Sequence, residues 1–506
     1  MKESDGDGKK FDAHISFGLD GCGTHSRYNG PSYMKTGIDT KNLIFSGFTF
    51  SRLTKNGKDV HKQENMASAE NCTPLYLIDG KETRELLREM MEIMEAEGKY
   101  FEEHPIYLEY EGEVFEVWVK LELTQLDGKC KQLLQGRGSA YCLLCSTSRK
   151  DAHNVQKIKE GFPMDISTEK MNDRFKTIKA AMEGTDEEKE EVGEYRLDTV
   201  HFTTEERLGV SFKPCVQHFE IANMLPPLHC RMRLFAWISD IMKRFDANKR
   251  TYYKKVDTDT QEKFDQVKKN YVDRSRDVMG KLMWAPSPDG GTTDDGNTSR
   301  MFFSYEKRNN VMDMMEPILE PAEGADEATY EEYYKKFQAK KEFQEVLWEL
   351  LHNLCTILNI INCDKLVRIE EFAELCTDTA LLVVEKLPWV QFSPTVHSVL
   401  AHAPQVIREN GNRGLLAFSE EGSEANHKSI RRLRERAARK MSLDRNLWDV
   451  LKKLWISSDL TFRKFKRVLV CSHCHATGHS VRGCPLKKEK SSNEDDVLFE
   501  KLTYDD

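Results

Sequence analysis

Hydrophobic and polar residues alternate in two stretches of the chain, and each stretch ends at an aspartate. In residues 11–20 the apolar side chains at every second position share one face, and Asp20 points to the other. In residues 115–127 the apolar side chains at every second position again share one face, and this stretch ends at Asp127. A period of two over this length predicts β-strands, so the sequence places one acid at the end of each of two strands.

The first quarter of the chain predicts a mixed α/β core. Further strands are expected at residues 43–53, 73–78 and 106–123, and one amphipathic helix is expected at residues 82–97. Three strands, a helix and another strand is the order in which a ribonuclease-H-like core begins. In that core the first and fourth strands are neighbours, which would bring Asp20 and Asp127 together.

The pattern turns helical after Cys145 and stays so to about residue 395. Prolines open residues 226–246 and suit the first turn of a helix. Residues 331–361 carry a sustained apolar stripe of period 3.6. The composition of residues 487–506 predicts a disordered acidic tail.

Composition restricts the class of protein. With 506 residues the chain is long enough for two to four domains. No apolar run approaches 18 residues and the N-terminus lacks the apolar core of a signal peptide, so neither a transmembrane helix nor a membrane partner is expected. We therefore interpret the 13 cysteines as metal ligands or buried thiols in a reducing compartment.

The charge is unevenly distributed. The net charge of −9 argues against nucleic acid, but residues 427–467 hold 14 Lys and Arg against 4 Asp and Glu, a local net charge of +10. A basic surface on an acidic chain is typical of local phosphate binding, although a solvated helix face would look the same. The candidate DNA-binding residues of this run are Lys428, Arg431, Arg432, Arg434, Arg436 and Arg439.

Glu424 opens this basic run and is the candidate third acid. Two acids on a sheet and one on a late helix suit two-metal phosphoryl transfer on nucleic acid. Each aspartate precedes a glycine, so a plain turn residue remains an alternative for both. Spacing alone does not choose Glu424 over Glu420 or Glu421.

Two sets of cysteines and histidines have the spacing of zinc ligands. Cys142 and Cys145 form a CxxC, and His397 and His402 could complete a tetrahedral structural site, although either histidine alone could be an ordinary core residue. The second set has the CX2CX4HX4C spacing of a zinc knuckle, a module that usually contacts nucleic acid. Its ligands are Cys471, Cys474, His479 and Cys484.

Several of these motifs together resemble one family. Residues 397–440, with LDGCGTHSRY at 19–28, TQLDGKC at 124–130 and YCLLCSTSR at 141–149, are similar to the catalytic core of the V(D)J recombination-activating protein and its Transib and ProtoRAG transposon relatives. The resemblance covers roughly residues 11–468. It implies a ribonuclease-H-like DDE core interrupted by a large helical zinc-binding insertion, followed here by the zinc knuckle.

The resemblance divides the chain and assigns roles to residues. The expected regions are the first part of the core, the helical insertion, the catalytic-glutamate and basic helices, and the knuckle with its acidic tail, at 1–140, 141–410, 411–468 and 469–506. The catalytic acids match Asp20, Asp127 and Glu424, and a further metal-binding carboxylate matches Glu82. The zinc ligands match Cys142, Cys145, His397 and His402. Trp389 matches an active-site tryptophan that would stack on an unpaired base, although a core aromatic is an equal alternative.

The implied activity is DNA recombination by a nuclear transposase. Two Mg²⁺ or Mn²⁺ ions per active site would serve nicking, hairpin formation and strand transfer at terminal inverted repeats, and two structural sites would hold Zn²⁺. The implied partners are double-stranded DNA, a second copy of the chain and an accessory subunit. Only 19 residues precede Asp20, whereas the family carries a dimerisation and repeat-binding region there. We therefore expect either a fragment or a chain that has lost its DNA-reading part.

Two other functions stay open. A domesticated or truncated, catalytically silent DNA-binding derivative would keep the basic run without the chemistry. An RNA-binding zinc-knuckle protein would account for residues 471–484 alone.

Overall fold

The computed structural model describes most of the chain, and the chain divides into two compact units. The first unit contains Met1–Lys81, Phe101–Leu121 and Glu420–Lys501, and the second contains Glu82–Tyr100, Glu122–Ser419 and Leu502–Asp506. The described residues are 9–22, 42–63, 68–80, 82–138, 141–145, 147–149, 151–164, 166–182, 210, 212–217, 219, 225–250, 257–280, 283–284, 295–439, 442–463 and 494–504.

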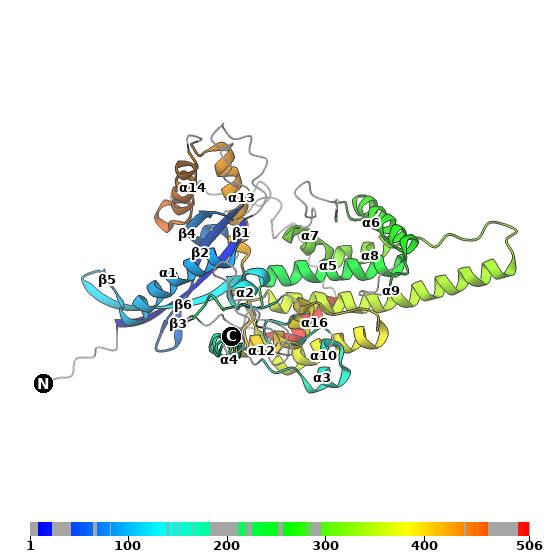
Figure 1. Ribbon diagram of the computed structural model, residues 1–506, viewed down its shortest axis with the longest axis horizontal. Helices are drawn as coiled ribbons and strands as arrows, with labels where there is room; N and C mark the ends of the chain where they lie inside the picture. The colour runs from blue at the N-terminus through cyan, green and yellow to red at the C-terminus, as the bar shows by residue number, and fades with distance from the viewer. Residues whose placement is uncertain are drawn as a thin grey trace. The chain divides into compact units, whose positions relative to one another are not determined.

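A six-stranded sheet forms the core of the first unit (Figure 1). Its order is β3-β2-β1-β6-β5, and β4 also pairs with β2. The strands are β1 (Lys10–Cys22), β2 (Leu43–Lys55), β3 (Lys58–Lys62), β4 (Cys72–Asp79), β5 (Ile106–Tyr110) and β6 (Glu113–Leu126). The expectation that the first strand and the last are neighbours is confirmed, and the protein is of the mixed α/β class.

Strand directions follow from the cross-strand contacts. β1 and β2 are antiparallel, as are β2 and β4. Lys9 Nζ lies 3.5 Å from Glu113 Oε1, and the Phe11 and Phe115 ring centroids are 6.0 Å apart. Because the beginnings of β1 and β6 lie side by side, these two strands run in the same direction.

The hairpin strand β3 was not among the sequence predictions. It pairs with the end of β2 through a turn at Asn56 and Gly57, which have positive φ angles of 51° and 74°. Asn-Gly is the strongest short signal for such a turn, so the sequence did contain the cue.

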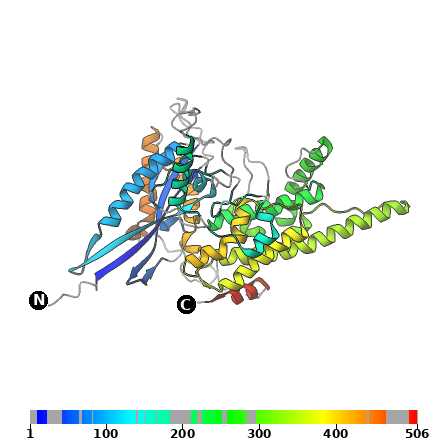
Figure 2. The ribbon, with the colours of Figure 1, turned by 60° about the horizontal axis from the view of Figure 1, so that its bottom comes forward.

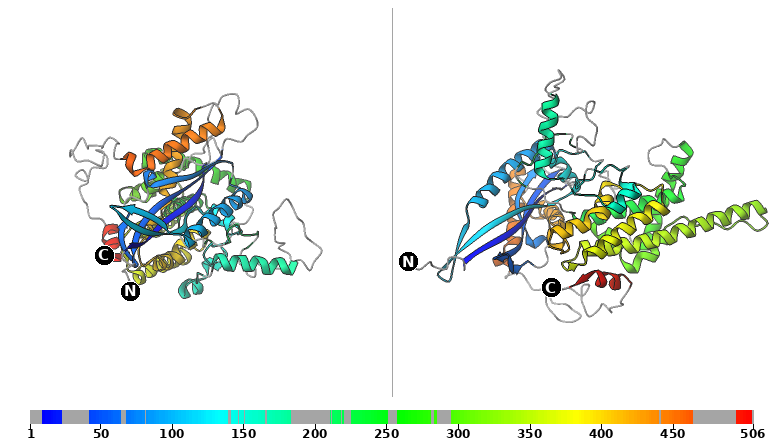
Figure 3. Two further views of the ribbon diagram at one scale, coloured as in Figure 1. Left: turned by 90° about the vertical axis from the view of Figure 1, so that its left-hand side faces the viewer. Right: turned by 90° about the horizontal axis from the view of Figure 1, so that it is seen from below.

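Two late helices cover one face of the sheet (Figures 1 and 3). These are α13 (Glu421–Arg436) and α14 (Leu443–Ser458), and the short α15 (Leu460–Arg463) follows. Ile430 of α13 and Leu454 of α14 pack with Phe45 and Cys72 of the sheet in one buried cluster. Apolar burial of this kind holds α13 against the strand that pairs with β1.

The second unit is mainly helical. Its helices include α5 (Pro227–Asp246) and α9 (Glu327–Ile361), which agree with the periodicity of residues 226–246 and 331–361. The N-terminal half of α9 is mostly exposed and extends beyond its neighbours (Figure 2). The others are α1 (Arg84–Glu103), α2 (Gly128–Leu134), α3 (Val155–Glu160), α4 (Thr168–Met182), α6 (Thr258–Met279), α7 (Gly296–Phe302), α8 (Tyr305–Asp313), α10 (Ile369–Lys386), α11 (Pro394–His397) and α12 (Ala403–Glu409).

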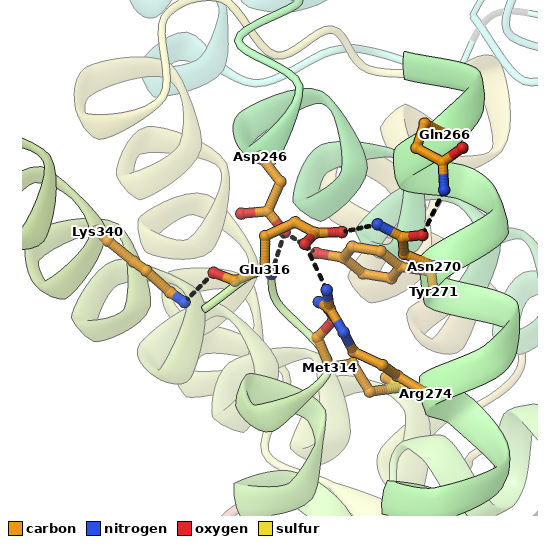
Figure 4. Close-up of polar contacts among 8 residues, drawn as sticks. All are labelled: Asp246, Gln266, Asn270, Tyr271, Arg274, Met314, Glu316 and Lys340. Atoms are coloured by element: carbon orange, nitrogen blue, oxygen red, sulfur yellow. Dashed lines mark hydrogen bonds and ion pairs between the residues drawn. The ribbon is translucent and has the colours of Figure 1, made fainter. Parts of the chain in front are cut away.

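A polar network joins α5, α6 and the segment before α9 (Figure 4). The buried Tyr271 donates a 2.6 Å hydrogen bond to Asp246 Oδ2, which also accepts from the Glu316 backbone N–H at 2.7 Å. Glu316 is in turn bound by Arg274 and by the Asn270 side chain. Each buried polar group in this network has a partner, so the network fixes helix positions rather than offering a reactive group.

The expectation of a disordered tail is wrong for residues 494–504. This segment forms α16 (Glu494–Leu502) and β8 (Thr503–Tyr504). β8 pairs with β7 (Leu366–Val367) in the second unit, and Leu502 and Thr503 are buried. The acidic composition did not prevent order, because the end of the segment buries Leu502 and its strand β8 pairs with β7. In the described part of the chain, no helix is long and apolar enough to cross a lipid bilayer.

Candidate metal centres

Four side chains from distant parts of the sequence meet in the second unit. Cys142, Cys145, His397 and His402 each offer a ligand atom, and these atoms lie within 4.8 Å of one another. His397 and His402 are buried, as is Cys142. Two sulfurs and two imidazole nitrogens at these separations suit a tetrahedral site, so the cluster could hold a metal ion such as zinc.

An irregular helix turn makes the two histidines face one site. Residues Ser398–His402 form a π-helical turn between α11 and α12. In a regular α-helix, residues five apart point about 140° apart, since each residue turns by roughly 100°. A π-turn bonds residues five apart and brings the two side chains nearer to one direction. The imidazole centroids of His397 and His402 are 5.2 Å apart.

The charge of the cluster favours a cation. Burial raises the pKa of Cys142, but the neighbouring Cys145, His397 and His402 side chains favour the thiolate, outweigh burial and hold that pKa well below its usual range. The pKa of Cys145 is raised, first by its hydrogen bond to Cys142 and then by burial. Two adjacent thiolates repel each other, so the second keeps its proton until a divalent cation offsets the repulsion.

Neighbouring groups orient the ligands of this cluster. His402 Nδ1 lies 2.8 Å from Gln405 Oε1, so Nδ1 carries the proton and Nε2 is left as a ligand atom. The buried His402 Nε2 has no hydrogen-bond partner among the described residues. Ser398 Oγ lies 3.2 Å from Cys142 Sγ. An orphaned buried nitrogen directed at two sulfurs is what a zinc ligand requires.

A second cluster lies in the first unit, where β1 ends and α13 begins. Asp20, Glu424 and His427 offer ligand atoms within 4.8 Å of one another. His427 Nδ1 lies 2.9 Å from Glu424 Oε2, and His427 Nε2 lies 3.7 Å from Asp20 Oδ2. The imidazole therefore spans the two carboxylates. Asp20 and His427 are largely buried, whereas Glu424 is half-exposed.

The packing of α13 accounts for this geometry. Asp20 pairs with Phe45 across the sheet, and the Phe45 ring meets His427 edge-on at 6.2 Å between centroids. The buried Asn426 donates to the carbonyls of Ala69 and Cys72, each at 3.4 Å. These contacts fix the first turns of the helix on the strand edge, so Glu424 and not the buried Glu420 joins Asp20.

Asp127 and Glu82 belong to the second unit. Asp127 follows β6 and caps α2, its Oδ1 accepting from the Cys130 backbone N–H. Asp127 is therefore the N-cap residue of α2, and the cap uses only one of its two carboxylate oxygens. Glu82 pairs with Lys129. Burial lowers the pKa of Lys129, but Glu82 and Asp127 outweigh burial and raise it. The structure brings Asp20 and Glu424 together, whereas the place of Asp127 and Glu82 beside them stays a prediction.

The basic run divides into exposed and buried members. Lys428, Arg431, Arg432 and Arg436 are exposed. Arg434 is 3% exposed and its Nε donates to Asn446 Oδ1 at 3.2 Å, so its assignment as a surface DNA-binding residue is corrected. It faces the core because α13 packs that side against α14.

Arg439, Trp389 and the knuckle complete the predicted sites. The guanidinium of Arg439 makes two hydrogen bonds of 2.8 Å to the carboxylate of Asp449. Trp389 is half-buried, and the Arg250 guanidinium carbon lies 5.9 Å from its ring centroid. Stacking of Trp389 on an unpaired base stays a prediction. The knuckle ligands at 471, 474, 479 and 484 lie outside the described residues.

Two residues of these clusters were absent from the sequence predictions. His427 is three residues after Glu424 on the same helix face, which is a signal that spacing could have supplied. Gln405 is three residues after His402 in a turn of irregular pitch, and sequence spacing does not reveal that contact.

Comparison with known proteins adds no assignment: no family model matches the chain, and no curated protein matches it either. The fold and the buried cluster thus define a mixed α/β protein with a Cys₂His₂ group able to hold a metal ion.

Proposed function

We propose that this chain is a metal-dependent DNA nuclease and strand transferase of the DDE transposase and recombinase class. One observation carries the proposal. Asp20 at the end of a central strand and Glu424 at the start of a late helix lie in one cluster, although they stand near opposite ends of the sequence. Convergent acids on a strand and a helix are the arrangement that two-metal phosphoryl transfer uses.

The residues of this cluster fit Mg²⁺ or Mn²⁺. Carboxylate oxygens are the ligands these hard cations prefer, and Asp20 and Glu424 would hold them. When bound, such ions polarise the phosphodiester, activate the attacking oxygen and stabilise the leaving one. The contact of His427 Nδ1 with Glu424 Oε2 positions that carboxylate.

Asp127 is the proposed third acid and Glu82 an additional carboxylate. The support is topological: β1 has an antiparallel neighbour in β2 and a neighbour of the same direction in β6. This is the arrangement expected of a ribonuclease-H-like core, and the acid that directly follows β6 is Asp127. The helical second unit with its Cys₂His₂ cluster is the proposed zinc-binding insertion.

DNA binding is assigned to α13. Lys428 and Arg432 follow Glu424 at intervals of four, so all three share one side of the helix, and both cations are exposed. Cations on the side of the proposed catalytic glutamate would hold backbone phosphates beside it. Such contacts position a duplex without reading its sequence.

The proposed reaction has two phosphoryl-transfer steps. Water attacks a phosphodiester and releases a 3′-hydroxyl, and this hydroxyl then attacks the opposite strand, forming a hairpin and releasing a second 3′ end. Strand transfer to a target would use the same displacement. A nuclear location, a homodimer, an accessory subunit and a nucleic-acid contact by the zinc knuckle belong to the same proposal.

The test is nicking and hairpin formation on plain and pre-nicked duplex DNA with Mg²⁺ or Mn²⁺. Glu424→Gln and Asp20→Asn should abolish cleavage and leave DNA binding largely intact, because neither removes a cation. Glu421→Gln on the same helix turn is the matched control and should cleave normally. Undiminished cleavage in both site variants would rule out this assignment. Metal-independent binding without cleavage in the unaltered chain would instead favour the silent DNA-binding derivative.

A further inference from the structure

The second unit contains a cavity of about 300 Å³ beside Asp127. Four segments line it: the end of β6 with the start of α2, Leu143 and Leu144 with the nearby Arg149, the first turns of α5 with the two residues before it, and the start of α11 with the first residue of the following π-turn. The cavity borders the candidate zinc cluster, since Leu144 and Ser398 line it and Ser398 Oγ lies 3.2 Å from Cys142 Sγ.

The lining carries an excess of positive charge. Lys129, Lys131, Arg149 and Arg233 contribute four cations, of which Lys129 is paired with Glu82, and Asp127 is the single carboxylate among the lining residues. The uncapped N-terminus of α5 adds partial positive charge, because Pro226 supplies no side-chain cap. A concave site with several cations and one acid favours an anion of high charge density, such as phosphate.

The remaining lining is apolar. Leu126, Leu143, Leu225 and Pro394 provide hydrophobic surface next to the basic groups. The volume is at the lower end of small-molecule pockets and is too small for a duplex about 20 Å wide, but it suits one nucleotide. A base or sugar would contact the apolar part, and a phosphate would contact the cations.

We propose that this cavity binds one unpaired nucleotide of a DNA strand, with Arg149 and Arg233 holding its phosphate. The inference rests on the proposed nuclease function, because Asp127 is an acid of that site and lines the same cavity. The Cys₂His₂ cluster then has a role in binding: it holds Leu144 and Ser398 in the cavity wall. The site would retain a single-stranded end next to Asp127.

Fluorescence anisotropy with an end-labelled oligothymidylate of eight nucleotides tests the proposal on the zinc-loaded full chain without added Mg²⁺. The variant is Arg149→Gln with Arg233→Gln, both at exposed positions where folding should tolerate them. The matched control is Lys268→Gln with Arg276→Gln, which removes the same charge from the exposed side of α6. Melting temperature is recorded for each protein.

Affinity for the oligonucleotide should fall about tenfold per arginine removed, and the salt dependence of log K should lose a slope of about 1.4. The control should retain both values, and duplex binding should change equally little in both proteins. Equal affinities in variant and control would overturn the cavity assignment. If the double variant does not fold, the single Arg233→Gln decides by the same criterion. Because binding is measured without cleavage, this result is independent of the Glu424→Gln experiment.

Discussion

Gln405 accepts a 2.8 Å hydrogen bond from His402 and donates one of 2.9 Å to the carbonyl of Phe162. The glutamine thus connects a candidate metal ligand to the backbone carbonyl of a residue 243 positions earlier in the sequence. This relationship sets the tautomer of His402, because a ring that donates from Nδ1 presents Nε2 as a lone pair.

Gln405→Ala should therefore weaken metal binding without removing a ligand. We expect a 10- to 100-fold lower zinc affinity, the usual effect of losing such a partner, and a smaller loss than Cys142→Ser causes. Competition with a chromogenic chelator measures the zinc affinity of each protein. Gln338→Ala on the exposed part of α9 is the control. Equal zinc affinity in Gln405→Ala and the unaltered chain would show that the hydrogen bond does not orient the ligand.

Arg432 and Arg434 are two residues apart and should differ in effect. Arg432→Ala should lower duplex affinity and reduce the salt slope by about 0.9, because it removes one exposed cation. Arg434→Ala should mainly destabilise the fold, since its buried guanidinium binds Asn446. Binding at several salt concentrations and thermal melting separate the effects. The reverse result would place the phosphate contacts on the other side of α13.

Asp246 should make stability depend on pH. Burial raises the pKa of Asp246, partly offset by the Tyr271 hydrogen bond. The folded chain therefore holds this proton at pH values where the unfolded chain has lost it, so stability falls as pH rises from about 3.8 through the folded pKa. Asp246→Asn keeps an acceptor oxygen and should lack this decline.

Melting temperatures of Asp246→Asn and the unaltered chain across that window provide the test. The difference between them should shift in favour of the variant as pH rises. The exposed Asp277→Asn is the control and should follow the unaltered chain. A constant difference at all pH values would mean that Asp246 does not titrate differently on folding.

The C-terminal strand should be held by its apolar end. Leu502 is 3% exposed and its carbonyl accepts from the Arg368 backbone N–H at 2.9 Å. Leu502→Asp would bury a charge without a partner, so β8 should detach from β7. Limited proteolysis should then cleave near residue 502 several times faster, whereas Tyr504→Ser, at an exposed position, should have a smaller effect. Unchanged cleavage would show that the pairing does not depend on Leu502.

The periodic stretches were enough to predict most of the first unit's sheet. Alternation over residues 11–20 and 115–123 specified two strands, because a buried strand must place every second side chain in the core. The order of strands and helix also predicted that β1 and β6 are neighbours, which the sheet confirms. The CxxC and the paired histidines identified the four members of the Cys₂His₂ cluster as ligand types.

Other features depended on contacts between residues distant in sequence. That Glu424 and not Glu420 reaches Asp20 depends on how Asn426 and Ile430 set the rotation of α13 on the sheet. The burial of Arg434 follows from the same rotation, and charge composition does not report it.

The sequence by itself determined the elements, the ligand types and the local excess of charge, because these follow from residue chemistry at fixed spacing. Only the tertiary structure decided which side chains share a site. The π-turn between His397 and His402, the span of His427 and the basic cavity beside Asp127 arise from packing, and packing energies are summed over contacts that no local pattern contains.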